Sequence, residues 1–169
     1  MVSPQNILLY LSAEQEQQVR EIFDALASRG FPRQNQTPHI TITFSHNMAP
    51  AAVESAAQVL PGVIPADFQR VGTAIFSTRR KQTVAWLLET GQLMRQAAWQ
   101  ISALNPDDHR SDWIPHLTMG LRIPRAMVPD YIAALDEVTP RHFKALLADR
   151  AGFWKPATRQ YRALAGPQQ

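Results

Sequence analysis

Residues 38–42 have the sequence PHITI, and residues 115–119 have the sequence PHLTM. Each segment places a histidine and a threonine two positions apart in a run of apolar and β-branched residues, which is typical of a strand. Because side chains alternate along a strand, the histidine and the threonine point to one face and the apolar residues point to the other. Each segment therefore predicts a strand that is anchored in the core and presents one imidazole and one hydroxyl.

The two segments occupy equivalent places in the chain. His39 and His116 are 77 residues apart, and the strands expected before them, which start near Ile7 and Thr83, have nearly the same offset. Two copies are too few for a solenoid, so this repeat predicts a duplicated chain with two lobes. The expected organisation is one bilobal domain over 1–169 with approximate halves 1–78 and 79–169, and with strands exchanged between the lobes.

Hydrophobic periodicity predicts alternating strands and helices along the whole chain. Strands are expected at 6–11, 39–45, 67–76, 82–89 and 116–123, with two more within 141–164. Helices are expected from an N-cap at residue 12 to a C-cap at residue 30, and at 49–60, 91–104 and 127–138. The predicted class is therefore α+β, with two sheets rich in antiparallel strands, helices outside them and a central groove between the lobes.

The composition narrows the class of protein. The 169 residues include no cysteine, which excludes a disulfide scaffold, a thiolate nucleophile and every cysteine-based metal site. The longest early apolar run is too short for a signal peptide or a membrane span, so we expect a cytoplasmic protein with no membrane contact. The net charge of +3 is a mild excess, which permits an anionic partner but disfavours binding to long RNA.

Two opposed pairs of histidine and threonine suit a particular chemistry. One imidazole accepts a proton from an attacking oxygen while the other donates a proton to the leaving oxygen. Two hydroxyls donate to the non-bridging oxygens, where negative charge accumulates. This chemistry needs no metal and no other cofactor, and its natural target is a phosphodiester. The metal alternative, in which His46 and His109 join His39 and His116, is disfavoured because seven residues along a strand separate the members of each pair.

The HITI and HLTM motifs, the order of elements around them and the segment from Phe76 to Trp86 resemble the two-histidine (2H) phosphoesterase superfamily. Within it, the chain is most similar to the bacterial branch of 2′-5′ RNA ligases and 2′,3′-cyclic phosphodiesterases. The resemblance implies a bilobal fold and metal-independent hydrolysis of 2′,3′-cyclic ends of RNA or of small nucleotides. It implies that His39 and His116 are the acid–base pair and that Thr41 and Thr118 hold the phosphate.

Several alternatives stay open from the sequence. The same groove can serve a 2′-5′ RNA ligase or transferase, or a module that binds RNA ends without turnover, and no protein partner is indicated. Some relatives carry a basic residue where this chain has Leu121; strand parity places the next residue, Arg122, on the phosphate-binding face unless a bulge intervenes. Trp113 is either a base-stacking residue or a buried anchor of its loop.

Overall fold

The structure, a computed structural model, describes residues 3–109 and 112–167. No helix in these two ranges is long and apolar enough to span a membrane. The elements follow the predicted order with ends shifted by only a few residues: β1 (Gln5–Leu11), α1 (Ala13–Ser28), β2 (His39–Ser45), α2 (Pro50–Val59), β3 (Ala66–Phe76), β4 (Lys81–Thr90), α3 (Gln92–Ser102), β5 (His116–Pro124), α4 (Val128–Val138), β6 (Ala145–Lys155) and β7 (Gln160–Ala165). Short 3₁₀ helices follow α2, at Leu60–Gly62, and precede α4, at Arg125–Met127.

All the strands belong to one antiparallel sheet with the order β1-β2-β5-β4-β3-β6-β7 and an additional β1–β6 pairing. The α+β prediction is confirmed, but the expectation of two separate sheets is wrong. The reason is β6, which pairs with β3 at its beginning and with β1 along the rest of its length. At Ala148 the strand has Leu11 on one edge and Ala66 on the other. One long strand thus joins the two halves into a continuous surface.

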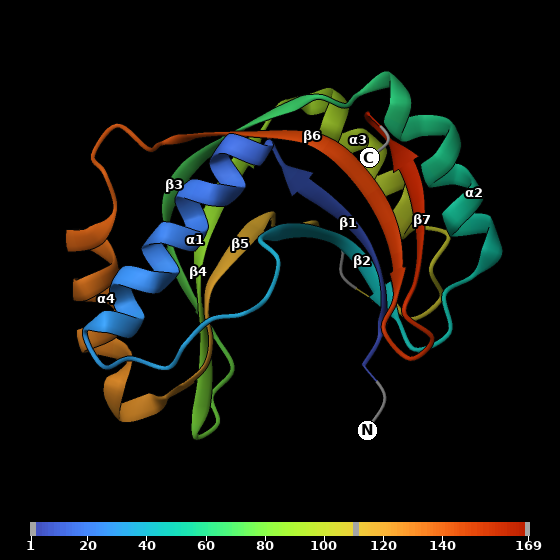
Figure 1. The fold of residues 1–169 in the computed structure, drawn as a ribbon. Helices are drawn as coiled ribbons and strands as arrows, with labels where there is room; N and C mark the ends of the chain where they lie inside the picture. The colour runs from blue at the N-terminus through green and yellow to red at the C-terminus, as the bar shows by residue number, and fades with distance from the viewer. Residues whose placement is uncertain (1–2, 110–111, 168–169) are drawn as a thin grey trace.

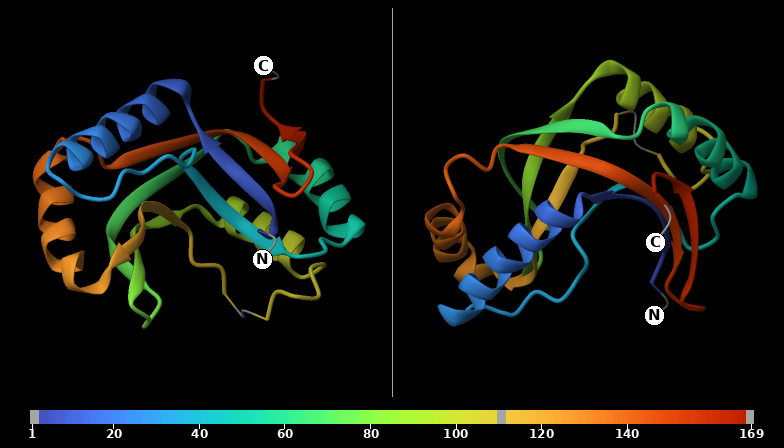
Figure 2. Two further views of the ribbon diagram at one scale, coloured as in Figure 1. Left: turned by 60° about the horizontal axis from the view of Figure 1, so that its bottom comes forward. Right: turned by 45° about the horizontal axis from the view of Figure 1, so that its top comes forward.

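The sheet arches, and the helices cover its outer side (Figures 1 and 2). Helices α1 and α4 pack together against one half, while α2 and α3 pack together against the other half. Alternate residues of the strands supply the buried side of the sheet, and Ile40, Ile42, Leu117 and Trp86 are at most 2% exposed. The other face of the central strands is left on the inner side of the arch, where no helix lies (Figure 1).

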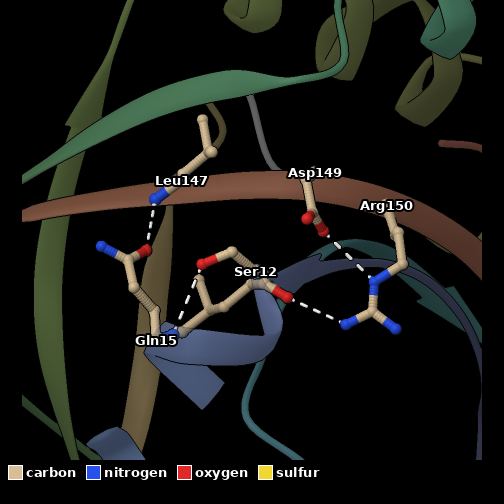
Figure 3. Close-up of polar contacts among 6 residues, drawn as sticks. Ser12, Gln15, Leu147, Asp149 and Arg150 are labelled. Carbon is tan, nitrogen blue, oxygen red and sulfur yellow. Dashed lines mark hydrogen bonds and ion pairs between the residues drawn. The ribbon is translucent and has the colours of Figure 1, made fainter. Parts of the chain in front are cut away.

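The beginning of α1 completes the edge of β6 where β1 ends (Figure 3). Ser12 caps the helix by accepting from the backbone N–H of Gln15, and its own N–H donates to the Leu147 carbonyl at 3.0 Å. The Gln15 side chain accepts from the Leu147 N–H at 2.6 Å and donates to the Ala145 carbonyl at 2.8 Å. A helix terminus therefore satisfies backbone groups that would otherwise lack a strand partner.

Candidate active site

The two histidine motifs meet at the centre of the sheet. The only register pair between β2 and β5 joins Ile40 to Leu117, and both of these side chains are fully buried. Extending this antiparallel register by one residue in each direction puts His39 opposite Thr118 and Thr41 opposite His116. Directly opposite residues share a face of a sheet. All four candidate side chains of the two motifs therefore lie on the face away from the buried pair.

This register sets the spacing of the four groups. Directly opposite residues in an antiparallel pair have Cβ atoms about 4.5–5.5 Å apart, and diagonal neighbours are about 7–8 Å apart. Each histidine is directly opposite the threonine of the other motif, and His39 is diagonal to His116. The register of β2 and β5 thus places the two imidazoles diagonally across the strand pair, with the two hydroxyls on the other diagonal.

Both imidazoles are held in the same way. The ring Nδ1 of His39 is 2.7 Å from the Thr37 carbonyl oxygen, and the ring Nδ1 of His116 is 2.8 Å from the Ile114 carbonyl oxygen. A carbonyl only accepts hydrogen bonds, so Nδ1 carries the proton in each ring. This tautomer leaves Nε2 of each neutral histidine as the acceptor that faces away from its own backbone. Because the partner is in both cases the residue two positions earlier, the two motifs are equivalent in detail.

The electrostatic environment favours the neutral form of His39. Burial of the ring lowers the pKa of His39, the hydrogen bond to Thr37 opposes this shift, and the nearby charge of His116 lowers the pKa further. The last effect means that the two imidazoles lie within electrostatic reach of each other. The lowered pKa keeps His39 mainly in its neutral form at neutral pH, and in that form Nε2 can accept a proton.

Aromatic residues border the four groups on both sides. The ring of Phe76, at the end of β3, lies 4.7 Å from the ring of His116 between centroids. On the other side, Tyr10 of β1 is the register partner of His39 and therefore shares its face. The two imidazoles and the two threonine hydroxyls thus have an aromatic ring on either side of them.

The segment that leads into the second motif is tied to the first. The Asn105 amide donates to the hydroxyl of Thr43 and to the carbonyl of Phe44, each at 2.8 Å, and Thr43 donates to Asp108 at 2.7 Å. Ser45 donates to Asp107 in a short contact. These bonds attach the loop after α3 to β2, so the positions of the two motifs depend on each other.

The chain is similar to known proteins in part of its sequence and in its fold. Residues 9–86, which include the first motif, match the family model described as LigT-like phosphoesterase. Over these residues the chain is similar to the LigT-like phosphoesterases. No curated protein sequence matches the chain. Among solved structures, Kluyveromyces marxianus Usb1 with uridine monophosphate has a TM-score of 0.56 at 10% identity, and a second structure of Usb1 from this yeast has a TM-score of 0.51 at 9% identity. Each alignment covers 95% of this chain and 97% of Usb1, which shows a shared fold.

Arg122 and Trp113 are the two other residues that the sequence singled out. The register between β4 and β5 shifts twice between Thr118 and Ile123, and Arg122 is exposed with a φ of 58°. A bulge thus intervenes, and the parity argument for Arg122 does not apply. The indole N–H of Trp113 donates to the Thr41 carbonyl at 2.9 Å, and its ring contacts buried Phe68, so the structure favours the loop anchor over the base-stacking alternative.

Sequence reasoning did not single out Tyr10 or Phe76 as residues of the candidate site. Both lie in strands whose alternation was visible, but their neighbours come from other strands. Tyr10 borders His39 only because β1 pairs with β2 in one particular register. The contact between Phe76 and His116 joins β3 and β5, two strands that both pair with β4. No local pattern carries that information.

Proposed function

We propose that the protein hydrolyses 2′,3′-cyclic phosphates, either at the ends of RNA or in small cyclic nucleotides, and that His39 and His116 are its acid and base. The observation that carries this proposal is the pairing of β2 with β5, which supports a single cluster of two imidazoles and two hydroxyls on one face of the sheet. A lone histidine motif would not distinguish catalysis from packing, whereas two motifs that face each other suit transfer of two protons at one phosphorus.

The reaction balances with these groups and one water molecule. His39 Nε2 accepts a proton from water as its oxygen forms a bond to phosphorus. His116, in its protonated form, donates a proton to the ribose 3′ oxygen as the bond from that oxygen to phosphorus breaks. The product is a 2′-phosphate with a free 3′ hydroxyl, and proton exchange with solvent restores both rings. The lowered pKa of His39 supports its assignment as the base.

The threonines stabilise charge rather than move protons. Thr41 and Thr118 lie beside the imidazoles, and their hydroxyls donate to the two non-bridging oxygens as negative charge develops on them. Loss of one such donor typically costs about 10²–10³ in kcat in other enzymes.

Two comparisons support the choice of substrate class. The family match supports phosphoesterase activity, and a protein of the same fold, Usb1, has been solved with uridine monophosphate. A nucleotide ligand is therefore compatible with the fold, and the mild positive charge of the chain suits short ends better than long RNA.

The test is hydrolysis of a dinucleotide that ends in a 2′,3′-cyclic phosphate, in excess chelator. We expect a 2′-phosphate product, and we expect His39→Ala and His116→Ala each to lower kcat at least about a hundredfold, because each removes one proton transfer. His142→Ala is the matched control, since His142 lies in the turn before β6, and should keep the wild-type rate.

Retention of full turnover by both active-site variants would overturn the assignment. Loss of wild-type activity in chelator would contradict the metal-free mechanism. Joined strands instead of a 2′-phosphate would identify a 2′-5′ ligase, in which a ribose hydroxyl replaces water. Tight binding of cyclic ends without formation of a product would indicate a module that binds RNA ends without turnover.

A further inference from the structure

One edge of β3 is covered only at its beginning. Residues 66–69 pair with β6 on this edge, and the N–H of Arg70 donates to the Lys144 carbonyl at 2.8 Å. From Val71 to Phe76, β3 pairs with β4 on one side, while no described strand or loop pairs with its other side. We call Val71–Phe76 the open edge. Its outward N–H and C=O groups are left to water, and such an edge can accept another strand.

The other half of the sheet shows how an equivalent edge is covered. β6 pairs with β1 on one side, as β3 pairs with β4, and its other side pairs first with β3 and then, from Ala151 onward, with β7. β7 runs antiparallel to β6. In the first half, the strand that follows β3 is β4, which already occupies the opposite side of β3. The chain thus supplies a covering strand for β6 and none for the open edge.

The residues of the open edge do not protect it from pairing. Apart from a register shift before Gly72, the strand is regular, and it has no charged residue and no proline. Val71 and Ile75 are each about half exposed, and a Cβ atom at Gly72 would meet no other atom within contact distance. Natural proteins protect exposed edges with charges, proline or a covering segment. The open edge is therefore suited to an extended chain.

A hollow of about 320 Å³ lies beside the open edge, on the side of the sheet that α4 covers. Its walls include Thr73 of β3, Trp86 of β4 and Ile132 of α4. Where a strand adds to the edge of a sheet, main-chain hydrogen bonds supply affinity and pockets for alternate side chains supply specificity. The hollow is such a pocket, and the indole of Trp86 and the side chain of Ile132 suit an apolar group.

Positive charge gathers at one end of the open edge. Arg79 and Arg80 lie in the turn that joins β3 to β4, and Lys81 begins β4; all three are exposed, and none forms an ion pair with another described residue. The hollow has Arg70 and Asp136 in its wall, so its charges offset each other. The pairs that β3 and β6 form are all antiparallel. A strand added in this direction begins at the turn, so its acidic residues should precede its apolar ones.

We propose that the open edge binds an extended segment of a partner protein, in which acidic residues precede a short run of apolar and β-branched residues. The segment adds to β3 as β7 adds to β6, and it places one apolar side chain in the hollow. The basic turn also suits a nucleic acid, but a nucleic acid has no peptide backbone to pair with a strand edge. A second copy of the chain fits less well, because antiparallel pairing of two open edges brings each basic turn to Arg70 and Lys144 of the other copy. The inference does not depend on the proposed function.

The probe is the peptide acetyl-EEEVTVTV-amide, and NMR spectra of the isotope-labelled protein show where it binds. We expect saturable shifts at the open edge and at the turn, together with slower amide exchange in the open edge. The peptide acetyl-VTVTVEEE-amide has the same composition with the charges at its other end, and it should bind about tenfold or more weakly. A form of the first peptide that is methylated on two adjacent central backbone nitrogens keeps every side chain and should not bind.

Two variants and two matched controls locate the site in the protein. Ile75→Lys should abolish binding of the first peptide, because a charge at an edge opposes strand pairing. Arg79→Glu should weaken binding about tenfold, since it reverses one charge of the basic turn. Leu93→Lys and Arg95→Glu make the same changes at exposed positions of α3 and should keep the wild-type affinity.

Four results would overturn the proposal. The first is the absence of saturable binding below about 1 mM peptide. The second is equal binding of the methylated form, or equal binding by Ile75→Lys and Leu93→Lys. The third is a wild-type dimer in sedimentation that Ile75→Lys converts to a monomer, which would assign the open edge to a second copy. The fourth is a set of shifts at the open edge with hexauridylate but not with the peptide, which would assign it to RNA.

Discussion

Replacement of Gln15 by alanine tests whether the start of α1 substitutes for a strand along β6. The side chain makes two hydrogen bonds to β6, one from the Leu147 N–H and one to the Ala145 carbonyl. The first is partly buried, and loss of its acceptor costs about 1–3 kcal/mol. The second is exposed, so water replaces it at a cost of about 0.5–1 kcal/mol. After a gain of a few tenths from the helix propensity of alanine, the free energy of unfolding should fall by about 1.5–3 kcal/mol.

The assay is denaturant and thermal unfolding, with amide hydrogen exchange as a local probe. For a chain of this size, each kcal/mol lowers Tm by about 2–4 °C, so Gln15→Ala should lower Tm by about 3–12 °C. The Leu147 amide should exchange faster. Gln17→Ala, an exposed change on the same helix, is the matched control, and Gln15→Glu should show an intermediate loss because it keeps the acceptor but not the donor.

A Gln15→Ala protein whose free energy of unfolding lies within about 0.5 kcal/mol of the Gln17→Ala protein would refute this reasoning. Unchanged exchange at Leu147 would do the same. Either result would mean that the backbone of β6 at this edge is satisfied by water and that α1 packs there without bonding it.

Three further predictions concern the site and the strand that carries its second half. NMR titration should find His39 still largely neutral at pH 6.5, where an ordinary histidine is half protonated. The lowered pKa of His39 then adds stability that is complete above that pH and declines as the pH falls below it. A curve of stability against pH without this decline would contradict the lowered pKa. Gly120→Ala should cost about 1–3 kcal/mol in chemical denaturation, because the new Cβ would lie 2.5 Å from the buried ring of Tyr131, and a neutral result would mean that the ring moves freely. Thr41→Val and Thr118→Val keep the shape of the strand and should each lower kcat by about 10²–10³, with KM as the check that binding persists; full activity in both would remove the hydroxyls from the mechanism.

Local sequence patterns were sufficient to predict the helices and strands and to identify the candidate catalytic residues. The alternation at 39–45 and 116–123 identified two strands, and the helical spacing between residues 12 and 30 identified α1, because side-chain period follows directly from backbone geometry. The strands before the two motifs have nearly the same offset as the motifs themselves, and this agreement predicted the repeated order of strands and helices. These inferences need only neighbours along the chain.

Strand alternation was not sufficient to predict the face of the sheet on which Arg122 lies. The parity argument assumed a regular strand, and the double shift of register after Thr118 breaks the alternation before Arg122 is reached. The presence of a bulge depends on how β5 pairs with β4 rather than on the residues of β5 alone. The same dependence explains why the sequence left two alternatives for Trp113, whose partners, Thr41 and Phe68, are 72 and 45 residues away.

The sequence by itself determined the types of elements, their order, the duplication and the two pairs of histidine and threonine, because each of these follows from short-range periodicity and from spacing along one chain. Only the tertiary structure decided that Ile40 pairs with Leu117, that β6 joins both halves into one sheet, and that Tyr10 borders His39. Those features are long-range strand registers, and a register is chosen by burial of a whole face against the rest of the molecule, which no local segment can specify.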